Sequence, residues 1–470
     1  MTTPTHVDQD VVPSPASSSL PALPGGSSSG RRTPMAVVVA GSLLTGSLVA
    51  VALAAAPLVP ATETTLTGAV LCGFATGWAA LAGLSARFTS QPQRWAAVPA
   101  VVLGASGLAL LALGSSAHPI IDWVWPLVLF GLAVWMAVRI RRELASRTAR
   151  WLLYPVIGAM SIAAIGGVYQ TVGTAVDAST VSMPGRLIDV GGHRLHISCA
   201  GSGSPTVVVE GGGGATAADL GWISTGVARE TTICVYDRAG RGWSEDAGAP
   251  QDADAISNDL DTLLHRADVP GPYVIAGHSF GGLYALTFAT HHPDEVAGMV
   301  LIDSTSPHYG SAATAAARPA ASETYDPIGR IAALTSSLAR LGFGRLYATV
   351  AQVDLPARER AEVRASTAMP GTLRSTIEEY AQANASMEQA ALLRDFGNKP
   401  LMVLTAGAGN ANDWTQKQDR LAALSTDSVH RVVDDATHDA LVGDPVHAAT
   451  TTQAILDVVQ AVRTGHTLSR

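Results

Sequence analysis

A serine set between two glycines is the first feature of the sequence that could do chemistry. Residues 277–281 read Gly-His-Ser-Phe-Gly, directly after the apolar run 273–276 and at the start of a helix-favouring stretch. A nucleophile presented on a sharp strand-to-helix turn leaves no room for side chains two positions to either side, so Gly277 and Gly281 let the flanking backbones approach. The pattern therefore predicts that Ser279 projects a reactive hydroxyl above the end of a strand.

The context of this motif matters, because the same pattern occurs twice. The copy at 26–30 lies in a segment of Pro, Ser, Thr and Gly, with no predicted strand before it and no helix after it. Such a composition buries too little apolar surface to offset chain entropy, so residues 1–34 are predicted to form a disordered tail. The copy at 277–281 has the strand-turn-helix context that the chemistry requires.

Three further segments follow predicted strands in an order that is typical of a known family. A four-glycine run at 211–214 follows one strand, residues 237–244 read Asp-Arg-Ala-Gly-Arg-Gly-Trp-Ser after the next strand, and His438 lies in a loop after the last. Together with the serine motif, these segments resemble the α/β-hydrolase fold family over about residues 184–460. The resemblance implies a serine hydrolase, in which the 237–244 segment has a structural role in a loop.

By this resemblance, the four-glycine run supplies part of an oxyanion hole. The backbone N–H of Gly212 would join that of Phe280 in stabilising the negative charge that develops on the substrate oxygen. The family commonly has His-Gly at this place, whereas this chain has Glu210 followed by Gly211. A carboxylate there would alter the pH dependence or bind a substrate amine, and the sequence leaves both interpretations open.

The serine hydroxyl needs a base, and the base needs a carboxylate that orients it. Of the thirteen histidines, His438 occupies the place that the family uses for the base, whereas His278 is expected to point elsewhere in a structural role. Asn410 holds the place where most of the family has the acid. Two aspartates at strand ends remain as candidates, and we favour Asp303, with Asp413 as the alternative acid.

After residue 184, short β-branched runs alternate with helical patterns, which predicts a mostly parallel sheet with helices on both faces. The Ala-rich residues 304–398 are too long for a plain connection and predict a helical cap or lid. The hydrolase core then comprises residues 184–303 and 399–465. Eight strands are expected, at 186–190, 194–199, 206–210, 232–236, 273–276, 299–302, 401–405 and 430–433.

The composition indicates that a membrane region precedes this domain. Only 14% of the residues are charged and 47% are hydrophobic, whereas soluble domains carry about 25% charged residues. The excess apolar residues lie within 35–172, which predicts an all-α transmembrane bundle. Five apolar stretches are each close to the ~20 residues that cross ~30 Å of hydrocarbon, at about 35–60, 66–86, 95–117, 123–140 and 151–172.

The positive charges predict the orientation of these spans, because Lys and Arg accumulate in cytoplasmic loops. All short-loop arginines fall on one side of the membrane, which places the N-terminus in the cytoplasm and the hydrolase domain outside it. They are Arg31, Arg32, Arg87, Arg94, Arg139, Arg141, Arg142, Arg147 and Arg150. A rival interpretation takes the first apolar stretch as a cleaved secretory signal.

The remaining composition excludes several classes of partner and cofactor. The net charge of −8 and the lack of a Lys/Arg block argue against nucleic acid. Three cysteines without CxxC spacing argue against a metal site, and no organic cofactor is implied. By the family resemblance Cys199 and Cys234 lie on neighbouring strands and would pair in an oxidising compartment, whereas Cys72 is a packing residue in the second span.

The combined interpretation is a cell-membrane protein with five spans and an extracytoplasmic serine hydrolase that cleaves an ester through an acyl-enzyme. The expected partners are a small-molecule or lipid-like acyl substrate and membrane lipid. Alternatives are a proline-type aminopeptidase, in which Glu210 would pair with a free amine, and a cofactor-free haloperoxidase. A membrane sensor that binds a ligand without turnover is the rival from another class, because a fold alone does not guarantee activity.

Overall fold

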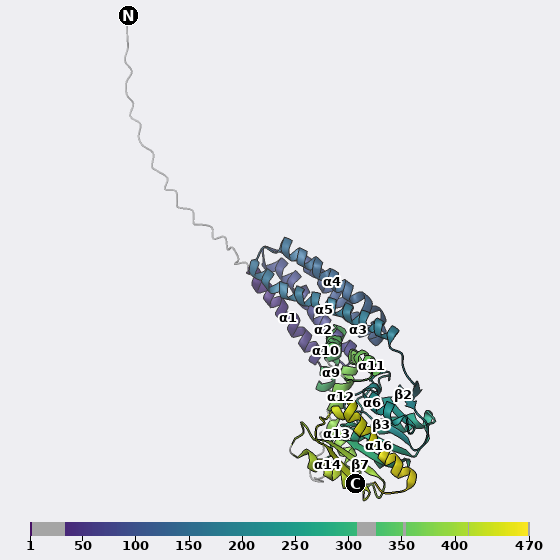
Figure 1. Cartoon of the computed structure of the whole chain (residues 1–470). Coiled ribbons are helices and arrows are strands. Elements are labelled where there is room, and N and C mark those ends of the chain that lie inside the picture. The colour runs from purple at the N-terminus through teal and green to yellow at the C-terminus, as the bar shows by residue number, and fades with distance from the viewer. Residues whose placement is uncertain (2–32, 308–325, 351–353, 412, 469–470) are drawn as a thin grey trace.

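The computed structural model describes residue 1 and residues 33–307, 326–350, 354–411 and 413–468. Helices long and apolar enough to cross a membrane form one end of the molecule, and a sheet covered by helices forms the other (Figure 1). The predicted tail at 1–34 falls almost entirely on residues outside the described ranges, as does part of the predicted cap.

Five apolar helices form the membrane end, which confirms the prediction of a helical membrane region. The fifth is the longest, and at ~1.5 Å per residue its 34 residues extend about 50 Å, well beyond the ~30 Å of hydrocarbon. Its last turns therefore extend towards the half that contains the sheet, and α5 contacts α9 and α10 there. The helices are α1 (Met35–Ala55), α2 (Glu63–Phe88), α3 (Ala97–Leu113), α4 (His118–Glu143) and α5 (Arg147–Thr180).

Small residues allow α1 and α2 to pack with their backbones in contact. A Cβ atom on Gly73 would collide with the backbone of Ala50, and one on Gly77 would lie 2.8 Å from the Cα of Gly46. Where no hydrophobic force separates helices from lipid, such close van der Waals packing is a main source of association. The first apolar stretch is thus an integral part of the bundle in this structure.

The sheet has eight strands in the order β1-β2-β4-β3-β5-β6-β7-β8, and each predicted strand is present. The first three in this order pair antiparallel and all others pair parallel, which confirms the mostly parallel sheet. The strands are β1 (Arg186–Asp189), β2 (Arg194–Ala200), β3 (Thr206–Glu210), β4 (Ile233–Asp237), β5 (Tyr273–His278), β6 (Val296–Ile302), β7 (Leu401–Ala406) and β8 (Ser428–Val433).

Helices cover both faces of this sheet, so its central strands are buried throughout. One face packs against α7 (Ala253–Arg266) and α8 (Gly281–His291), and the other against α6 (Gly221–Val227) and α16 (Pro445–Thr464). Both cores consist mainly of Val, Ile and Leu from alternate strand positions. The carboxyl ends of the parallel strands are left to carry the site.

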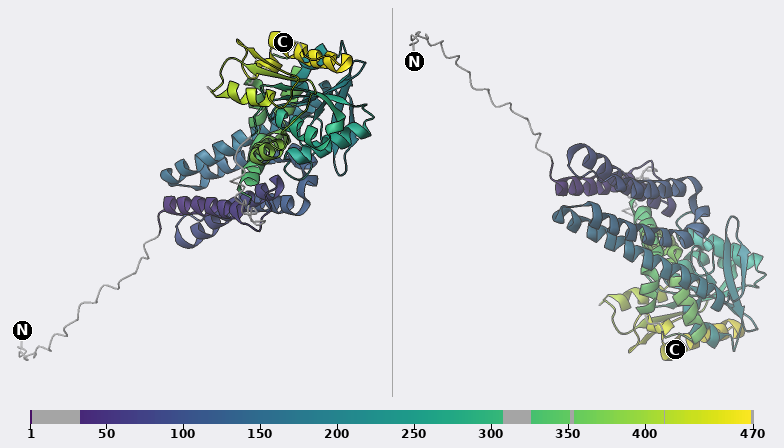
Figure 2. Two further views of the ribbon diagram at one scale, coloured as in Figure 1. Left: turned by 90° about the horizontal axis from the view of Figure 1, so that it is seen from below. Right: turned by 90° about the horizontal axis from the view of Figure 1, so that it is seen from above.

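The described residues between β6 and β7 lie mainly in helices, as predicted for a cap. Figure 2 shows these helices, in green, between the membrane helices and the sheet. The described helices are α9 (Pro327–Arg340), α10 (Phe343–Val350), α11 (Ala357–Thr367), α12 (Pro370–Ala381) and α13 (Ala383–Ala390).

The cap is bonded to the membrane bundle, a contact that the sequence analysis did not predict. Arg330 of α9 donates to the carbonyl oxygen of Ala54 in the last turn of α1 and to that of Val59 in the connection to α2, both at 2.6 Å. The Arg345 guanidinium of α10 lies 2.7 Å from the Asp177 carboxylate near the end of α5. The cap therefore joins the two halves of the molecule.

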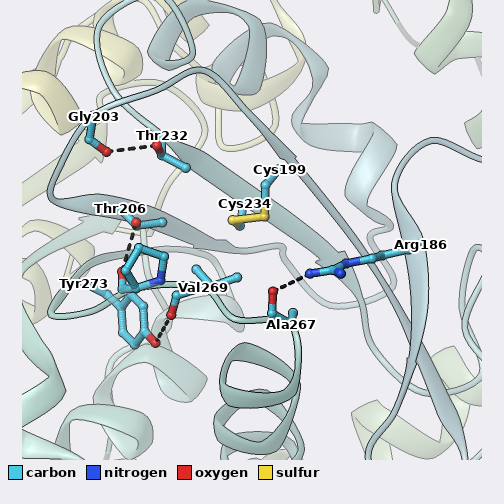
Figure 3. The surroundings of a disulfide bond; sticks show 10 residues. Arg186, Cys199, Gly203, Thr206, Thr232, Cys234, Ala267, Val269 and Tyr273 are labelled. Atoms are coloured by element: carbon cyan, nitrogen blue, oxygen red, sulfur yellow. Dashed lines mark hydrogen bonds between the residues drawn. A yellow bond between two sulfur atoms is a disulfide. The ribbon is translucent and has the colours of Figure 1, made fainter.

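A disulfide links Cys199 on β2 to Cys234 on β4 (Figure 3). The two residues are directly opposite each other in the antiparallel pair, so the bond crosses between neighbouring strands, as the resemblance implied. Cys72 is a free cysteine within α2.

Candidate active site

The turn after β5 holds Ser279 in a left-handed backbone conformation, with φ at 55°. Few residues other than glycine adopt this conformation without strain, so it must be held by its surroundings. The Ser279 amide donates to the carbonyl of Ile302 at 3.1 Å, and the Ser279 carbonyl accepts from Thr305 at 3.0 Å. A Cβ on Gly277 would collide with the backbone of Gly281, which is the crowding that the motif predicted.

His438 and Asp303 meet across the carboxyl ends of the strands. His438 Nδ1 lies 2.6 Å from Asp303 Oδ2, and Asp303 is fully buried at the end of β6. The other carboxylate oxygen accepts from the Ala406 amide at 3.0 Å and from Trp414 Nε1 at 2.6 Å. Asn410 Nδ2 is also within 3.4 Å of that oxygen. These donors fix the carboxylate and thereby the orientation of the imidazole.

Burial and the hydrogen bond between these two groups act on their pKa values in opposite directions. Burial by itself raises the pKa of Asp303, but the bonds from His438, Trp414 and the Ala406 amide together lower that pKa below its ordinary value. Burial likewise lowers the pKa of His438, but the hydrogen bond to Asp303 and the negative charges of Asp303 and Asp439 together outweigh burial, so the net pKa of His438 is raised. The pair therefore favours the imidazolium that a general base becomes after it accepts a proton.

The alternative acid, Asp413, lies apart from this pair. Its side chain is 56% exposed and forms an ion pair with Lys417 at 2.8 Å. Asn410, which holds the family's usual place for the acid, instead donates to the carboxylate of Asp303. Sequence reasoning missed this support from Asn410 and Trp414, and their position in the stretch just past the seventh strand was the signal that could have found it.

His278 contacts the candidate base, contrary to the expectation that it points elsewhere. Its Nε2 lies 3.1 Å from the carbonyl oxygen of His438, and the two imidazole rings are 4.6 Å apart. Burial, followed by repulsion from His438, lowers the pKa of His278 to about 4. The ring is therefore neutral at physiological pH, and with its proton on Nε2 it donates to the His438 carbonyl.

The four-glycine loop lies against the nucleophile. A Cβ atom added to Gly212 would lie 3.2 Å from the Cβ of Ser279. The Gly212 backbone is therefore packed directly against the serine, with little room for a side chain between them. Arg238 donates to the carbonyls of Gly211 at 2.9 Å and Gly212 at 2.6 Å, which holds both peptide groups in place. Phe280 is the N-cap residue of α8, at the helix end that carries a partial positive charge.

A cluster of buried charges lies behind this loop. Glu379 of cap helix α12 is bonded to Arg241 and lies 3.0 Å from Arg238, and the Tyr284 hydroxyl donates to it at 2.7 Å. Glu379 also accepts from the amide of Gly214 at 2.8 Å. The two arginines lower the pKa of Glu379 against the effect of burial. No sequence signal distinguished this glutamate within the cap, because its partners come from distant segments.

Glu210 faces the same cluster and has no exposed surface. Its carboxylate accepts from the Tyr236 hydroxyl at 2.7 Å, and burial raises its pKa to about 7 despite the nearby Arg238. A carboxylate enclosed in this way does not face a substrate amine, which removes the basis for an aminopeptidase. Asp237 is structural as expected, since it bonds His196 at 2.8 Å and the Ala217 amide at 2.7 Å.

Comparisons with known proteins agree with this fold. A family model of the alpha/beta hydrolase fold matches residues 205–445, which are 241 of the 470 residues. A Schizosaccharomyces pombe protein described as uncharacterized is 28% identical over 303 residues, covering 56% of this chain and 54% of that protein. Lipase LipV of Mycobacterium tuberculosis is 43% identical over 74 residues, covering 16% of this chain and 28% of the lipase.

Among solved structures, a thermophilic esterase from Thermogutta terrifontis is 21% identical and covers 58% of this chain and 95% of the esterase, with a TM-score of 0.44. The chain spans about half the length, or less, of the curated relatives named above. The family match covers strands β3 to β8, the serine turn and the loop that carries His438, whereas β1 and β2 precede it. The chain belongs to the α/β hydrolase fold family.

Proposed function

We propose that this protein is a membrane-anchored serine hydrolase that cleaves an ester through an acyl-enzyme. The observation that carries the proposal is the left-handed serine turn beside a buried, hydrogen-bonded Asp303 and His438 pair. A serine of this kind is activated when a base can take its proton and a carboxylate fixes the base. The proposed triad is therefore Ser279, His438 and Asp303.

In the proposed reaction, Ser279 Oγ attacks the ester carbonyl while His438 Nε2 takes the hydroxyl proton. The oxyanion that forms accepts hydrogen bonds from the backbone N–H groups of Phe280 and Gly212. Collapse of this intermediate expels the alcohol, which receives the proton from His438. Water then repeats the sequence on the acyl-enzyme and releases the acid, with His438 again acting first as base and then as acid.

The apolar side chains of the cap favour a lipid-like substrate. Helices α9 and α10, which contact the membrane bundle, expose large apolar side chains that would face lipid at the bilayer surface. On its other side, the cap places the Tyr380 ring 5.0 Å from the ring of Phe280, next to the serine. The exposed apolar residues that do not line the space between the membrane helices are Ile328, Ile331, Phe343, Leu346, Tyr347 and Val350.

We also propose that the hydrolase domain lies outside the cytoplasm. The arginines of the short loops favour this orientation, and the Cys199–Cys234 disulfide is typical of an oxidising compartment. A reporter fused after Arg470 should be active only on the extracytoplasmic side. Activity in the cytoplasm instead would reverse the assignment.

A fluorophosphonate probe applied to membranes tests the proposed chemistry directly, because it reacts only with activated serines. We expect strong labelling of the wild type, no labelling of Ser279→Ala, and weak labelling of Asp303→Asn. Asp413→Asn is the matched control and should label like the wild type. A folded wild-type protein that does not react would instead favour a ligand-binding module without turnover.

A further inference from the structure

Helix α5 of the membrane bundle is bonded directly to the residues that precede cap helix α12. Gln170 of α5 is 6% exposed, and its Nε2 donates to the carbonyl oxygen of Ala368 at 2.9 Å. Ala368 lies two residues before Pro370, the first residue of α12. A hydrogen bond that is shielded from water is electrostatically stronger than one in solvent. The start of α12 is therefore fixed to a helix of the membrane bundle.

A close backbone contact reinforces this attachment one turn earlier in α5. A Cβ atom on Gly166 would collide with the backbone carbonyl of Leu341, the residue that follows α9. A Cβ atom on the next cap residue, Gly342, would in turn collide with the carbonyl of Gly166. Helix α9 packs against α12 within the cap. The cap therefore rests on α5 at two points, one at the end of α9 and one at the start of α12.

The opposite end of α12 carries Glu379 to the four-glycine loop beside the serine. One of its carboxylate oxygens accepts from the Gly214 amide at 2.8 Å, and the other lies 3.0 Å from the Arg238 guanidinium. Arg238 donates to the carbonyl of Gly211 at 2.9 Å, and that carbonyl belongs to the same peptide group as the Gly212 N–H. Glu379 therefore holds the proposed oxyanion donor through one intermediate side chain.

Helix α12 connects these two contacts, and it lies between α9 and the sheet (Figure 1). At ~1.5 Å per residue, Glu379 lies about 14 Å along the helix from Pro370. A rigid helix of this length carries a displacement of its first turn to its last. Oxyanion donors tolerate little displacement, since a shift of about 1 Å at a reacting centre can cost ~10²-fold in rate. A change in the contact with α5 should therefore reach the four-glycine loop.

We propose that Glu379 is a positioning residue for the oxyanion hole and that the membrane bundle acts through it. Helix α5 holds the start of α12, and Glu379 at the other end holds the Gly214 amide and Arg238, which fixes the peptide group that carries the Gly212 N–H. The bundle thus supports turnover in addition to anchoring the chain. The inference rests on the proposed hydrolysis, because an oxyanion forms only when Ser279 attacks a carbonyl.

The first test measures kcat and KM of the full-length protein in lipid nanodiscs, with p-nitrophenyl butyrate as the ester. Glu379→Gln keeps the size of the side chain but removes the negative charge that both arginines contact. It should lower kcat about tenfold to hundredfold, less than the ~10²–10³-fold loss of a whole oxyanion donor. KM should change little, because the oxyanion exists only in the transition state.

Two further variants control for folding and for position. Glu379→Asp keeps the charge on a shorter side chain, and should lower kcat about threefold while the protein stays folded. Glu378→Gln changes the neighbouring residue, which pairs with Arg374 instead, and should keep the kcat of the wild type. A role in folding alone would lower the yield of folded protein without changing kcat. An unchanged kcat in both folded Glu379 variants would overturn the proposal.

A second test examines the contact with the membrane bundle. Gln170→Leu removes the bond to the Ala368 carbonyl and should lower kcat about fivefold, the loss expected for one hydrogen bond. Thr171→Val removes a bond within the bundle, from Thr171 Oγ1 to the Asp122 carbonyl at 2.8 Å, and should leave kcat unchanged. In the Glu379→Gln background, Gln170→Leu should lower kcat by less than about twofold, because both changes act through α12. Equal effects of Gln170→Leu and Thr171→Val, or the same loss in both backgrounds, would overturn the proposal.

Hydrogen exchange separates failure of this inference from failure of the proposed hydrolysis, because exchange needs no substrate. The peptide that contains the Gly214 amide should exchange about tenfold faster in Gln170→Leu and in Glu379→Gln, and at the wild-type rate in Thr171→Val. Wild-type exchange in Gln170→Leu would overturn the link between α5 and the four-glycine loop, whatever the activity. A wild type that neither cleaves the ester nor reacts with fluorophosphonate would instead refute the hydrolysis, and the oxyanion role of Glu379 with it.

Discussion

The two halves of the molecule bury their charges in different ways. In the hydrolase half, Glu379 is 5% exposed and is held between Arg238 and Arg241 with further hydrogen bonds from a tyrosine and an amide. Where the cap meets the membrane half, the Arg340 side chain of α9 is 30% exposed and contacts Glu63 and Asp122 beside an open cavity. The first cluster fixes the cap next to the serine, whereas the second joins the cap to the membrane helices.

This difference follows from the solvent around each half. The sheet gains its stability by excluding water from a close-packed interior, so any charge inside it must be fully paired. The membrane helices are surrounded by hydrocarbon on their outer faces and associate through local close contacts such as that of Gly46 with Gly77, without a hydrophobic force that drives water from between them. We therefore expect substitutions to have large effects in the hydrolase half and small effects at the membrane contact.

The largest expected effect is that of Asp303→Asn. Loss of the carboxylate that orients His438 should reduce kcat by about 10⁴-fold, as expected when a triad base loses its acid. The carboxylate raises the pKa of His438, and the base must be neutral to act, so wild-type activity should rise with pH through that raised pKa. In the variant, the residual activity should begin to rise at lower pH. A pH profile that does not move would show that Asp303 does not govern the base.

Glu379→Ala should cause the next largest effect, this time on stability. Removing the carboxylate leaves two buried arginines without their shared partner, which costs about 3–5 kcal/mol. Chemical unfolding in detergent measures the loss. The neighbouring Glu378→Ala is the matched control, because its weaker pair with Arg374 at 3.5 Å predicts a change below about 1 kcal/mol. Equal losses of stability in the two variants would mean that the buried Glu379 contributes no more to stability than Glu378 does.

His278→Phe tests a positioning role within the site. The variant keeps an aromatic ring but removes the donor to the His438 carbonyl, and we expect kcat to fall about fivefold to tenfold while KM changes little, the loss expected for one hydrogen bond of ~1–1.5 kcal/mol. A purely structural role would lower the yield of folded protein and leave kcat unaltered. His466→Phe, at an exposed position near the C-terminus, should behave as the wild type.

Arg340→Met should have the smallest effect, because half-exposed ion pairs contribute about 0–1 kcal/mol. The variant should be slightly less stable than the wild type. This difference should shrink as salt is added, because salt screens the ion pairs of the wild type. Limited proteolysis should cleave the cap faster in the variant than in the wild type. A loss as large as that of Glu379→Ala would mean that the two clusters are equivalent, and the comparison would fail.

Local patterns were sufficient to predict the elements of this protein. The five spans follow from apolar length, and all eight strands follow from β-branched runs between turn residues. Ser279 and Gly277 could be predicted because a strand, a tight turn and a helix are consecutive in the chain. The neighbouring positions of Cys199 and Cys234 came from the family resemblance, since their strands are separated by β3 in sequence.

Contacts between distant segments could not be predicted in this way. Asp303 and Asp413 both follow strands, and the choice between them depends on which carboxylate the fold turns towards His438. Glu379 is one of several acidic residues in a helical cap, and its role depends on two arginines more than a hundred residues away.

The sequence by itself determined the membrane region, the order of strands along the chain and the serine turn, because each depends on residues within one short segment. Only the tertiary structure decided which aspartate meets His438, where His278 points, how the cap contacts the membrane helices and where a cavity remains between them. The physical reason is that burial and hydrogen-bond partners are properties of packed surfaces, which form from segments whose relative positions no local pattern specifies.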